Sequence, residues 1–131
     1  MENKEFAKKL ELRTRQFAIS IIKMSASLPK SAESLVIRNQ VTKSGTSIGA
    51  NYREANRSRS KKDFKNKIKI SESEASETIY WLEIILELNW IEPNYICEIM
   101  KESKELLAIL HPFQTNSRND NSRHFKYFRH L

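Results

Sequence analysis

The residues whose types and spacing first suggest chemistry are the pentapeptide GTSIG at positions 45–49. It fits the G-x-S-x-G pattern of a nucleophile elbow, which places a serine between a strand and a helix and needs a histidine and an acid elsewhere. Here the preceding LVIRNQVTK has helical periodicity, and every histidine lies at or beyond His111. We therefore expect a helix-packing segment, no catalytic residue and no enzymatic activity.

A metal or cofactor site is not expected either. Di-iron four-helix bundles use Glu-x-x-His pairs, and the sequence contains no such pair. His111, His124 and His130 lack zinc-ligand spacing. The single cysteine, Cys97, is more typical of a small buried side chain than of a ligand.

The strongest chemical signal is a basic run between positions 53 and 69. Lys and Arg exchange condensed counterions for phosphates, so such a run can bind nucleic acid with strong salt dependence and little base specificity. Like charges at i,i+4 spacing repel each other, which favours a bound partner, while a solvated charged face is the alternative interpretation. The residues assigned to nucleic-acid binding are Arg53, Arg57, Arg59, Lys61, Lys62, Lys65 and Lys69.

Composition limits the fold class and the compartment. The chain has 131 residues, two glycines and three prolines, which favours one all-α domain. Its net charge of +7 is unevenly distributed, because residues 70–114 carry nine Glu against two Lys. The single cysteine and the absence of an N-terminal apolar run predict a cytoplasmic protein that is neither secreted nor inserted in a membrane.

Hydrophobic periodicity predicts four helices joined by short links. The first spans residues 3–27, the second begins after the N-cap Ser31, and the third spans residues 61–91. The fourth ends at Pro112. We predict an antiparallel up-down-up-down four-helix bundle over residues 1–113, followed by a basic, mobile tail over residues 114–131.

The third helix sets the architecture. Ser60 is its expected N-cap, with Asp63 three residues on, and Pro93 is its expected stop. A length of about 45 Å, at roughly 1.5 Å per residue, indicates an elongated bundle. Its core seam is Phe64, Ile68, Ser71, Ala75, Thr78, Leu82 and Ile85. On the second helix, the small residues Gly45 and Gly49 would let another helix approach closely.

A second apolar strip on the third helix predicts self-association. It consists of Trp81, Ile84, Leu88 and Ile91, which lie off the core seam and which a monomer would leave exposed to water. The acidic third and fourth helices could face the basic first and second helices of a neighbour. Such a heterologous contact closes into a ring rather than a two-fold dimer.

Three segments carry a family resemblance. SGTSIGANYREA, RSRSKKDF and EASETIYWLEI closely resemble the signature of the 23S rRNA intervening-sequence protein family, over roughly residues 5–112. The resemblance implies a four-helix bundle that assembles into a ring, typically a homopentamer. Much of the family has a proline near position 49, where this chain has Gly49, a variant that is also compatible with the pattern.

The function expected from these observations is a non-enzymatic oligomeric bundle that binds nucleic acid, with structured RNA favoured. The alternative is a protein-interaction scaffold. It rests on a resemblance to the accessory variability proteins of diversity-generating retroelements, which are similar basic bundles that join a reverse transcriptase to nucleic acid.

Overall fold

The computed structural model describes residues 2–113, which form four α-helices and a short 3₁₀ turn. The elements are α1 (Glu2–Ser25), α2 (Ala32–Asn56), α3 (Lys61–Glu87), α4 (Pro93–Leu110) and η1 (His111–Phe113). This part of the chain contains no strand. The prediction of an all-α four-helix bundle is confirmed, and the predicted tail lies outside the described residues.

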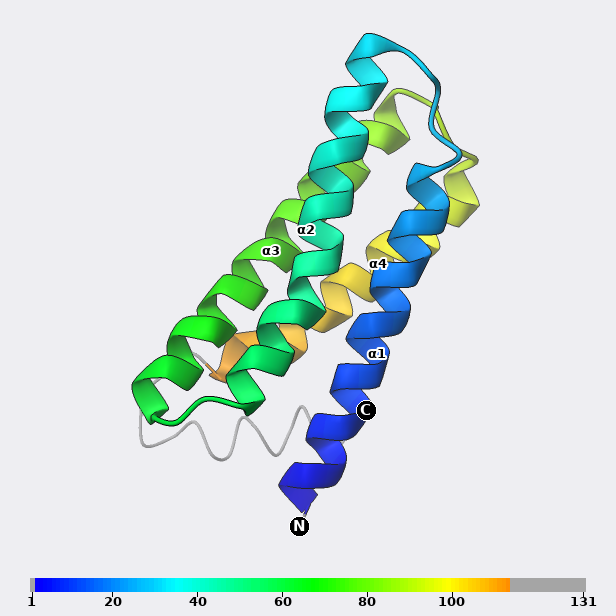
Figure 1. The fold of residues 1–131 in the computed structure, drawn as a ribbon. Coiled ribbons are helices and arrows are strands. Elements are labelled where there is room, and N and C mark those ends of the chain that lie inside the picture. The colour runs from blue at the N-terminus through cyan, green and yellow to red at the C-terminus, as the bar shows by residue number, and fades with distance from the viewer. Residues whose placement is uncertain (1, 114–131) are drawn as a thin grey trace.

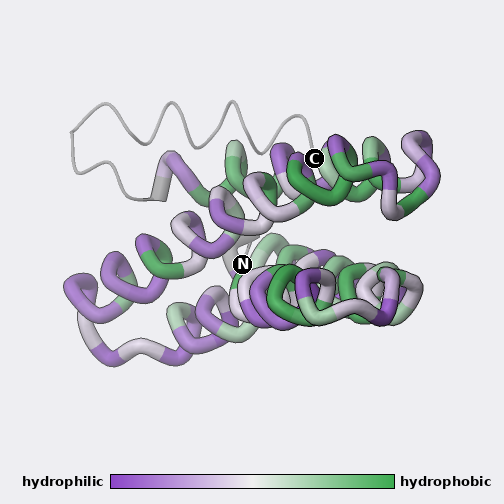
Figure 2. Tube along the Cα trace, turned by 90° about the horizontal axis from the view of Figure 1, so that it is seen from above, coloured by the Kyte–Doolittle hydropathy of each residue, from purple (hydrophilic) through white to green (hydrophobic). Residues whose placement is uncertain are grey.

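The helices alternate in direction and form two hairpins (Figure 1). Seen from above, the α1–α2 hairpin lies in one layer and the α3–α4 hairpin in the other (Figure 2). The layers are joined chiefly by α2 against α3, whereas α1 meets α4 over a much shorter stretch. At about 1.5 Å per residue, α3 is roughly 40 Å long, which gives the bundle its elongated shape.

Side-chain caps begin three of the helices. The Ser31 hydroxyl accepts from the Ser34 N–H at 3.1 Å, and the Ser60 hydroxyl accepts from the Asp63 N–H at 3.1 Å, as predicted. The Glu92 carboxylate plays the same part for α4 and accepts from the Tyr95 N–H at 3.0 Å. Each cap satisfies an N–H that the first helical turn leaves without an intrahelical partner.

The end of α3 differs from the prediction, because the helix stops at Glu87 and not near residue 91. Asn89 has a left-handed φ of 54°, a conformation that asparagine tolerates better than most residues. The Asn89 N–H donates to the Leu86 carbonyl and the Trp90 N–H to the Ile85 carbonyl, which is the pattern of a Schellman cap. This local turn therefore ends the helix several residues before Pro93.

One core lies between the layers, built from the predicted seams. The α3 seam is confirmed, except that Phe64 is only half-buried. Two of its hydroxyl residues contact α2 through hydrogen bonds: Ser71 Oγ donates to the Ile48 carbonyl at 2.7 Å, and Thr78 Oγ1 lies 3.0 Å from Ser44 Oγ. These bonds join α2 to α3 inside the core, where an unpaired hydroxyl would be costly.

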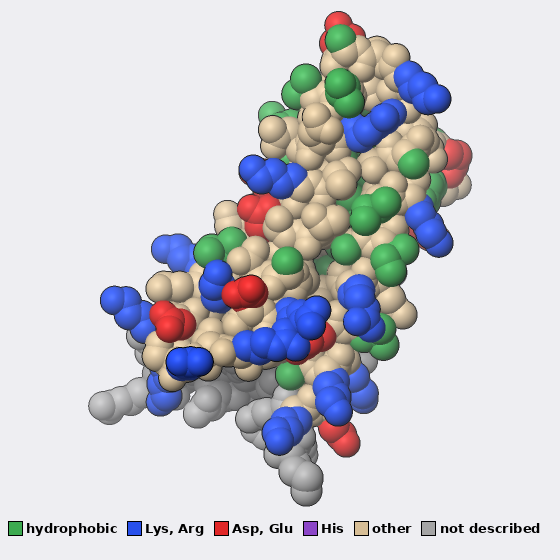
Figure 3. All heavy atoms as spheres, viewed as in Figure 1, with side chains coloured by type: hydrophobic (Ala, Val, Ile, Leu, Met, Phe, Trp, Pro, Cys, Tyr) green, Lys and Arg blue, Asp and Glu red, His purple; other side chains and the backbone are tan. Residues whose placement is uncertain are grey.

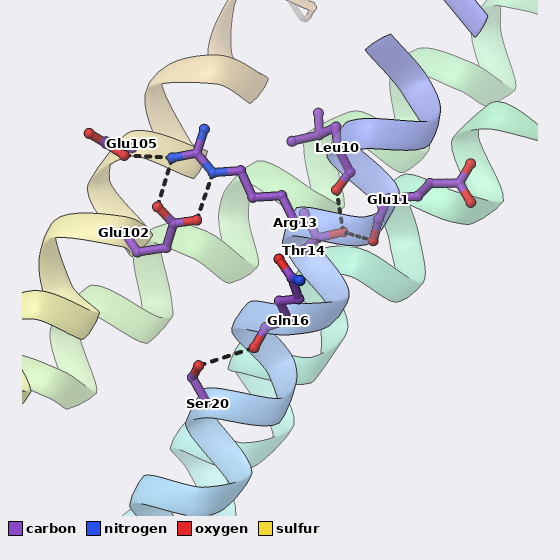
Figure 4. A network of polar contacts seen from close by, with 8 residues as sticks. All are labelled: Leu10, Glu11, Arg13, Thr14, Gln16, Ser20, Glu102 and Glu105. Carbon is purple, nitrogen blue, oxygen red and sulfur yellow. Dashed lines mark hydrogen bonds and ion pairs between the residues drawn. The ribbon is translucent and has the colours of Figure 1, made fainter. Parts of the chain in front are cut away.

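An ion pair joins α1 to α4, two helices that meet over only a short stretch (Figure 4). The Arg13 guanidinium donates two hydrogen bonds of 2.7 Å to the Glu102 carboxylate and a third to Glu105. The bond to Glu102 is the main reason why the pKa of Arg13 lies above its ordinary value, and partial burial opposes that rise. The forked geometry orients α1 against α4.

The helices α1 and α2 approach each other closely at the two glycines of α2. A Cβ at Gly45 would lie 2.8 Å from Ile21 side-chain atoms, and Ile21 is fully buried. A Cβ at Gly49 would lie 2.8 Å from Thr14 Oγ1 and 3.3 Å from the Thr14 backbone carbon. The sequence prediction that these glycines permit close packing is confirmed, and α1 is the helix that they admit.

We expect Gly45→Ala and Gly49→Ala each to lower the free energy of unfolding, although alanine is the better helix former. Overpacking costs about 1–3 kcal/mol, while the gain in helix propensity is about 1 kcal/mol. The measurement is urea unfolding followed by circular dichroism. Ala50→Gly, at an exposed site on the same helix, measures the propensity effect separately. Stabilisation by both alanine variants would contradict the close approach.

Candidate nucleic-acid interface

The basic run is folded around the α2–α3 junction. Arg53 lies in the last turns of α2, Arg59 in the link, and Lys61 begins α3. Lysine and arginine side chains gather at this end of the bundle and over the neighbouring half of α1 (Figure 3). The positive end of the α3 dipole and the negative end of the α2 dipole meet here and oppose each other, so the positive charge of the junction comes mainly from its lysine and arginine side chains.

A groove between α1 and α2 brings basic residues from both helices together. Its volume is about 290 Å³, and it is lined by Glu11, Thr14, Arg15, Ala18, Thr46, Gly49, Ala50, Arg53 and Arg57. Arg15 was not predicted, because it is separated from Arg53 by most of two helices in the sequence. The only signal for it was its position off the apolar stripe of the first helix.

The arginines of the bundle fall into two groups. Arg13 binds Glu102 and Glu105, and Arg38 donates to the Leu28 carbonyl at 2.9 Å, so both hold the fold together. By contrast, Arg15, Arg53 and Arg57 are exposed and make no hydrogen bond or ion pair within residues 2–113. The second group therefore has its donors available for a ligand.

Of the basic run, only Arg53 and Arg57 line this groove, and two of its lysines make contacts elsewhere. Lys67 pairs with Glu54 at 3.8 Å, which links α3 to α2. Lys69 lines a different groove, of about 580 Å³, between α3 and α4, together with Lys104 and His111. The predicted set of basic residues is thus divided between two faces of the bundle, and His111 in the second groove pairs with Glu72.

A buried tyrosine lies near the contact between Glu11 and Asn56. Tyr52 is 2% exposed, and burial raises the pKa of its phenol to about 12. The side chain of Asn56 opposes this rise as a hydrogen-bond partner, while the negative charge of Glu11 adds to it. Asn56 Nδ2 in turn donates to Glu11 Oε2 at 2.9 Å, so a polar contact links the end of α2 to α1.

The raised pKa of Tyr52 predicts a loss of stability at high pH. An unfolded tyrosine ionises near pH 10, while the folded one keeps its proton to about pH 12. The neutral Tyr52 phenol therefore makes its full contribution to the free energy of unfolding below pH 10. That contribution is lost as the pH rises to 12, and the total loss is at most about 2–3 kcal/mol. Urea unfolding between pH 8 and 11.5 measures it. Tyr52→Phe should lack this part of the fall in stability. If the stability of the two proteins fell in parallel with pH, the prediction would be contradicted.

The GTSIG segment lies within the continuous helix α2. Ser47 Oγ donates to the Lys43 carbonyl at 2.6 Å, one helical turn away, and no strand–turn–helix arrangement surrounds it. Over the described range, no group of three or more His, Cys, Asp and Glu side chains could hold a metal ion. Cys97 is exposed on α4, so the expectation that it would be buried is wrong.

The residues predicted for self-association differ in exposure. Leu88 is 50% exposed, Trp81 and Ile84 are half-buried, and Ile91 is only 9% exposed. The prediction that a monomer leaves all four exposed is therefore wrong for Ile91, because the turn at Asn89 folds it onto the core. Trp81 Nε1 is buried and has no hydrogen-bond partner in residues 2–113.

None of the helices in the described part of the chain combines the length and apolar character needed to cross a bilayer.

The fold and the arginine groove define a small helical bundle with a cationic end. Residues 5–112 match the family model of the 23S rRNA-intervening sequence protein, and the chain belongs to this family. It is also similar to a crystal structure from Bacteroides thetaiotaomicron, described as a protein of unknown function from the S23 ribosomal protein family. The two chains are 34% identical, with a TM-score of 0.75, over 81% of this chain and 98% of that one. Comparison with curated proteins gave no match.

Proposed function

We propose that this protein is a non-enzymatic, cytoplasmic bundle that binds nucleic acid, with structured RNA favoured, through the α2–α3 end. The observation that carries the proposal is the convergence of Arg15, Arg53 and Arg57, without partners in the described residues, on one groove between two helices. Arg59, Lys61, Lys62 and Lys65 extend the cationic surface around the junction.

Electrostatics favours a bound polyanion over a merely solvated face. Arg53 and the C-cap Arg57 are four residues apart at the end of α2, as are Lys61 and Lys65 on α3, and such like-charge pairs on a helix each cost a few tenths of a kcal/mol. Phosphates would reverse the sign of that energy and release condensed counterions. Arginine also matches phosphate with two parallel hydrogen bonds, which lysine cannot do.

Reversing three charges at the junction tests this proposal. In filter binding with a structured RNA, the variant with Arg57→Glu, Lys61→Glu and Lys65→Glu should retain little RNA. Wild-type affinity should fall steeply between 50 and 200 mM salt, with a slope of about −0.7 to −0.9 for each phosphate neutralised. Any residual binding by the variant should have a slope smaller by about two to three.

The matched control reverses the same amount of charge elsewhere. Lys23, Lys30 and Lys101 are exposed and lie away from the α2–α3 junction. Their triple change to Glu should weaken binding much less, and circular dichroism should show both variants to be helical. Equal RNA retention by wild type and the junction variant would overturn the proposal, and so would an equal loss in both triple variants.

We further propose that the bundle works as a closed ring, with five subunits as the family resemblance implies. Support comes from α3, where Trp81, Ile84 and Leu88 keep exposed or half-buried apolar surface after the core is complete. A neighbour could also offer an acceptor to the buried Trp81 Nε1, which has none in the described chain. Exposed apolar side chains on α2, Leu35 and Val36, are further candidates for contact.

Light scattering coupled to size exclusion, at micromolar protein, measures the assembly. Wild type should elute as an oligomer, and Trp81→Glu should shift it toward the monomer, because a charge would be buried at the contact. Ser76→Glu, at an exposed site on the same helix, is the matched control and should leave the mass unchanged. A monomer mass for wild type would refute the ring.

A protein-interaction scaffold, such as a partner of a reverse transcriptase, is the second candidate. It is favoured by exposed apolar residues on α1, namely Leu12, Ile19 and Ile22, which are 45–49% exposed and lie on a helix outside the proposed α3 contact. The two candidates differ in what the purified protein does by itself. The first binds RNA alone, and the second needs its protein partner.

A further inference from the structure

The arginine groove contains one acidic residue, and its position is fixed. Glu11 of α1 lines the groove beside Arg15, Arg53 and Arg57. Its Oε2 accepts from Asn56 Nδ2 at 2.9 Å, so the last residue of α2 holds the carboxylate in place. Its Oε1 accepts no hydrogen bond from residues 2–113. The groove therefore presents a positioned anionic acceptor among cationic donors.

These two kinds of group recognise different parts of a ligand. Guanidinium groups donate to phosphate oxygens, often in pairs. An ionised carboxylate only accepts hydrogen bonds, and it repels phosphate, so it contributes to binding only if the ligand brings a donor. A ribonucleotide brings both groups close together, because the 2′-hydroxyl lies on the sugar that the phosphates join.

The shape of the groove limits the ligand to a small unit. Its volume of about 290 Å³ is at the lower end of small-molecule sites. Between the arginines its lining includes the small residues Ala18, Gly49 and Ala50. These short side chains leave the space for a sugar and a phosphate rather than for a large ligand.

We propose that the α1–α2 groove is a ribonucleotide subsite. Arg15, Arg53 and Arg57 hold phosphate, and Glu11 accepts a hydrogen bond from the adjacent ribose 2′-hydroxyl. The protein thereby prefers RNA to DNA of the same sequence. This inference rests on the proposed nucleic-acid binding and adds to it a chemical reason for selecting RNA.

Fluorescence anisotropy with one sequence in three forms, namely RNA, DNA and 2′-O-methyl RNA, tests the subsite. Wild type should bind RNA about tenfold more tightly than either analogue, as expected for one hydrogen bond to a charged group. Arg15→Ala should weaken binding of all three forms. Glu11→Gln should tighten binding of DNA, because it removes the repulsion between carboxylate and phosphate. It should tighten binding of RNA less, because the hydrogen bond to the 2′-hydroxyl is weakened. The ratio of RNA affinity to DNA affinity should therefore fall toward one.

The matched control is Glu33→Gln, which removes an exposed negative charge from the first turn of α2, far from the groove. It should leave the RNA preference unchanged. If a ribonucleoside monophosphate competes with the oligonucleotide, the subsite takes a free nucleotide. If it does not compete, the subsite takes a segment of chain, and either result agrees with ribonucleotide chemistry.

Two results overturn the proposal while leaving nucleic-acid binding intact. One is equal affinity of wild type for the three forms. The other is an RNA preference that Glu11→Gln leaves unchanged, which would mean that Glu11 only repels phosphate. Failure of wild type to bind any of the three at low salt would instead overturn the proposed function itself.

Discussion

The close approach of α1 to α2 is the constraint on which the rest of the structure depends. It exists because positions 45 and 49 carry no side chain, and a methyl group at either would collide with Ile21 or Thr14. The same approach makes the floor of the groove and sets Arg15 opposite Arg53 and Arg57. Packing and the candidate binding site therefore have the same cause. Glycine is unfavourable in a helix interior, and contact between the two helices offsets this cost.

Polar contacts complete the bundle where apolar packing is thin or where small residues leave gaps. Inside the core, Ser71 and Thr78 bond to α2, so that the two layers are held at a definite register. At the edge, Arg13 ties α1 to Glu102 of α4. Such partly exposed ion pairs are individually weak, commonly below about 1 kcal/mol, but the forked geometry restricts how the helices can turn.

The difference between partnered and unpartnered arginines separates the charge that holds the fold together from the charge that the proposed binding would use. Arg13 and Arg38 have acceptors within the chain and contribute to the fold. Arg53 and Arg57, at the end of α2, have no acceptor in the described residues, so their donors are available to the proposed ligand. Glu11 differs from both groups, because it is held by Asn56 at the rim of a groove that is otherwise cationic.

The sequence by itself determined the helices, their caps at Ser31 and Ser60, the seam of α3 and the presence of a basic run, because periodicity and capping depend on residues a few positions apart. Only the tertiary structure decided that Arg15 joins the groove while Lys69 lies on another face, that Ile91 is buried, and that Cys97 is exposed. These outcomes depend on how one helix is rotated and spaced against the next. That is set by contacts between residues far apart in the chain, such as Gly49 with Thr14, which no local pattern encodes.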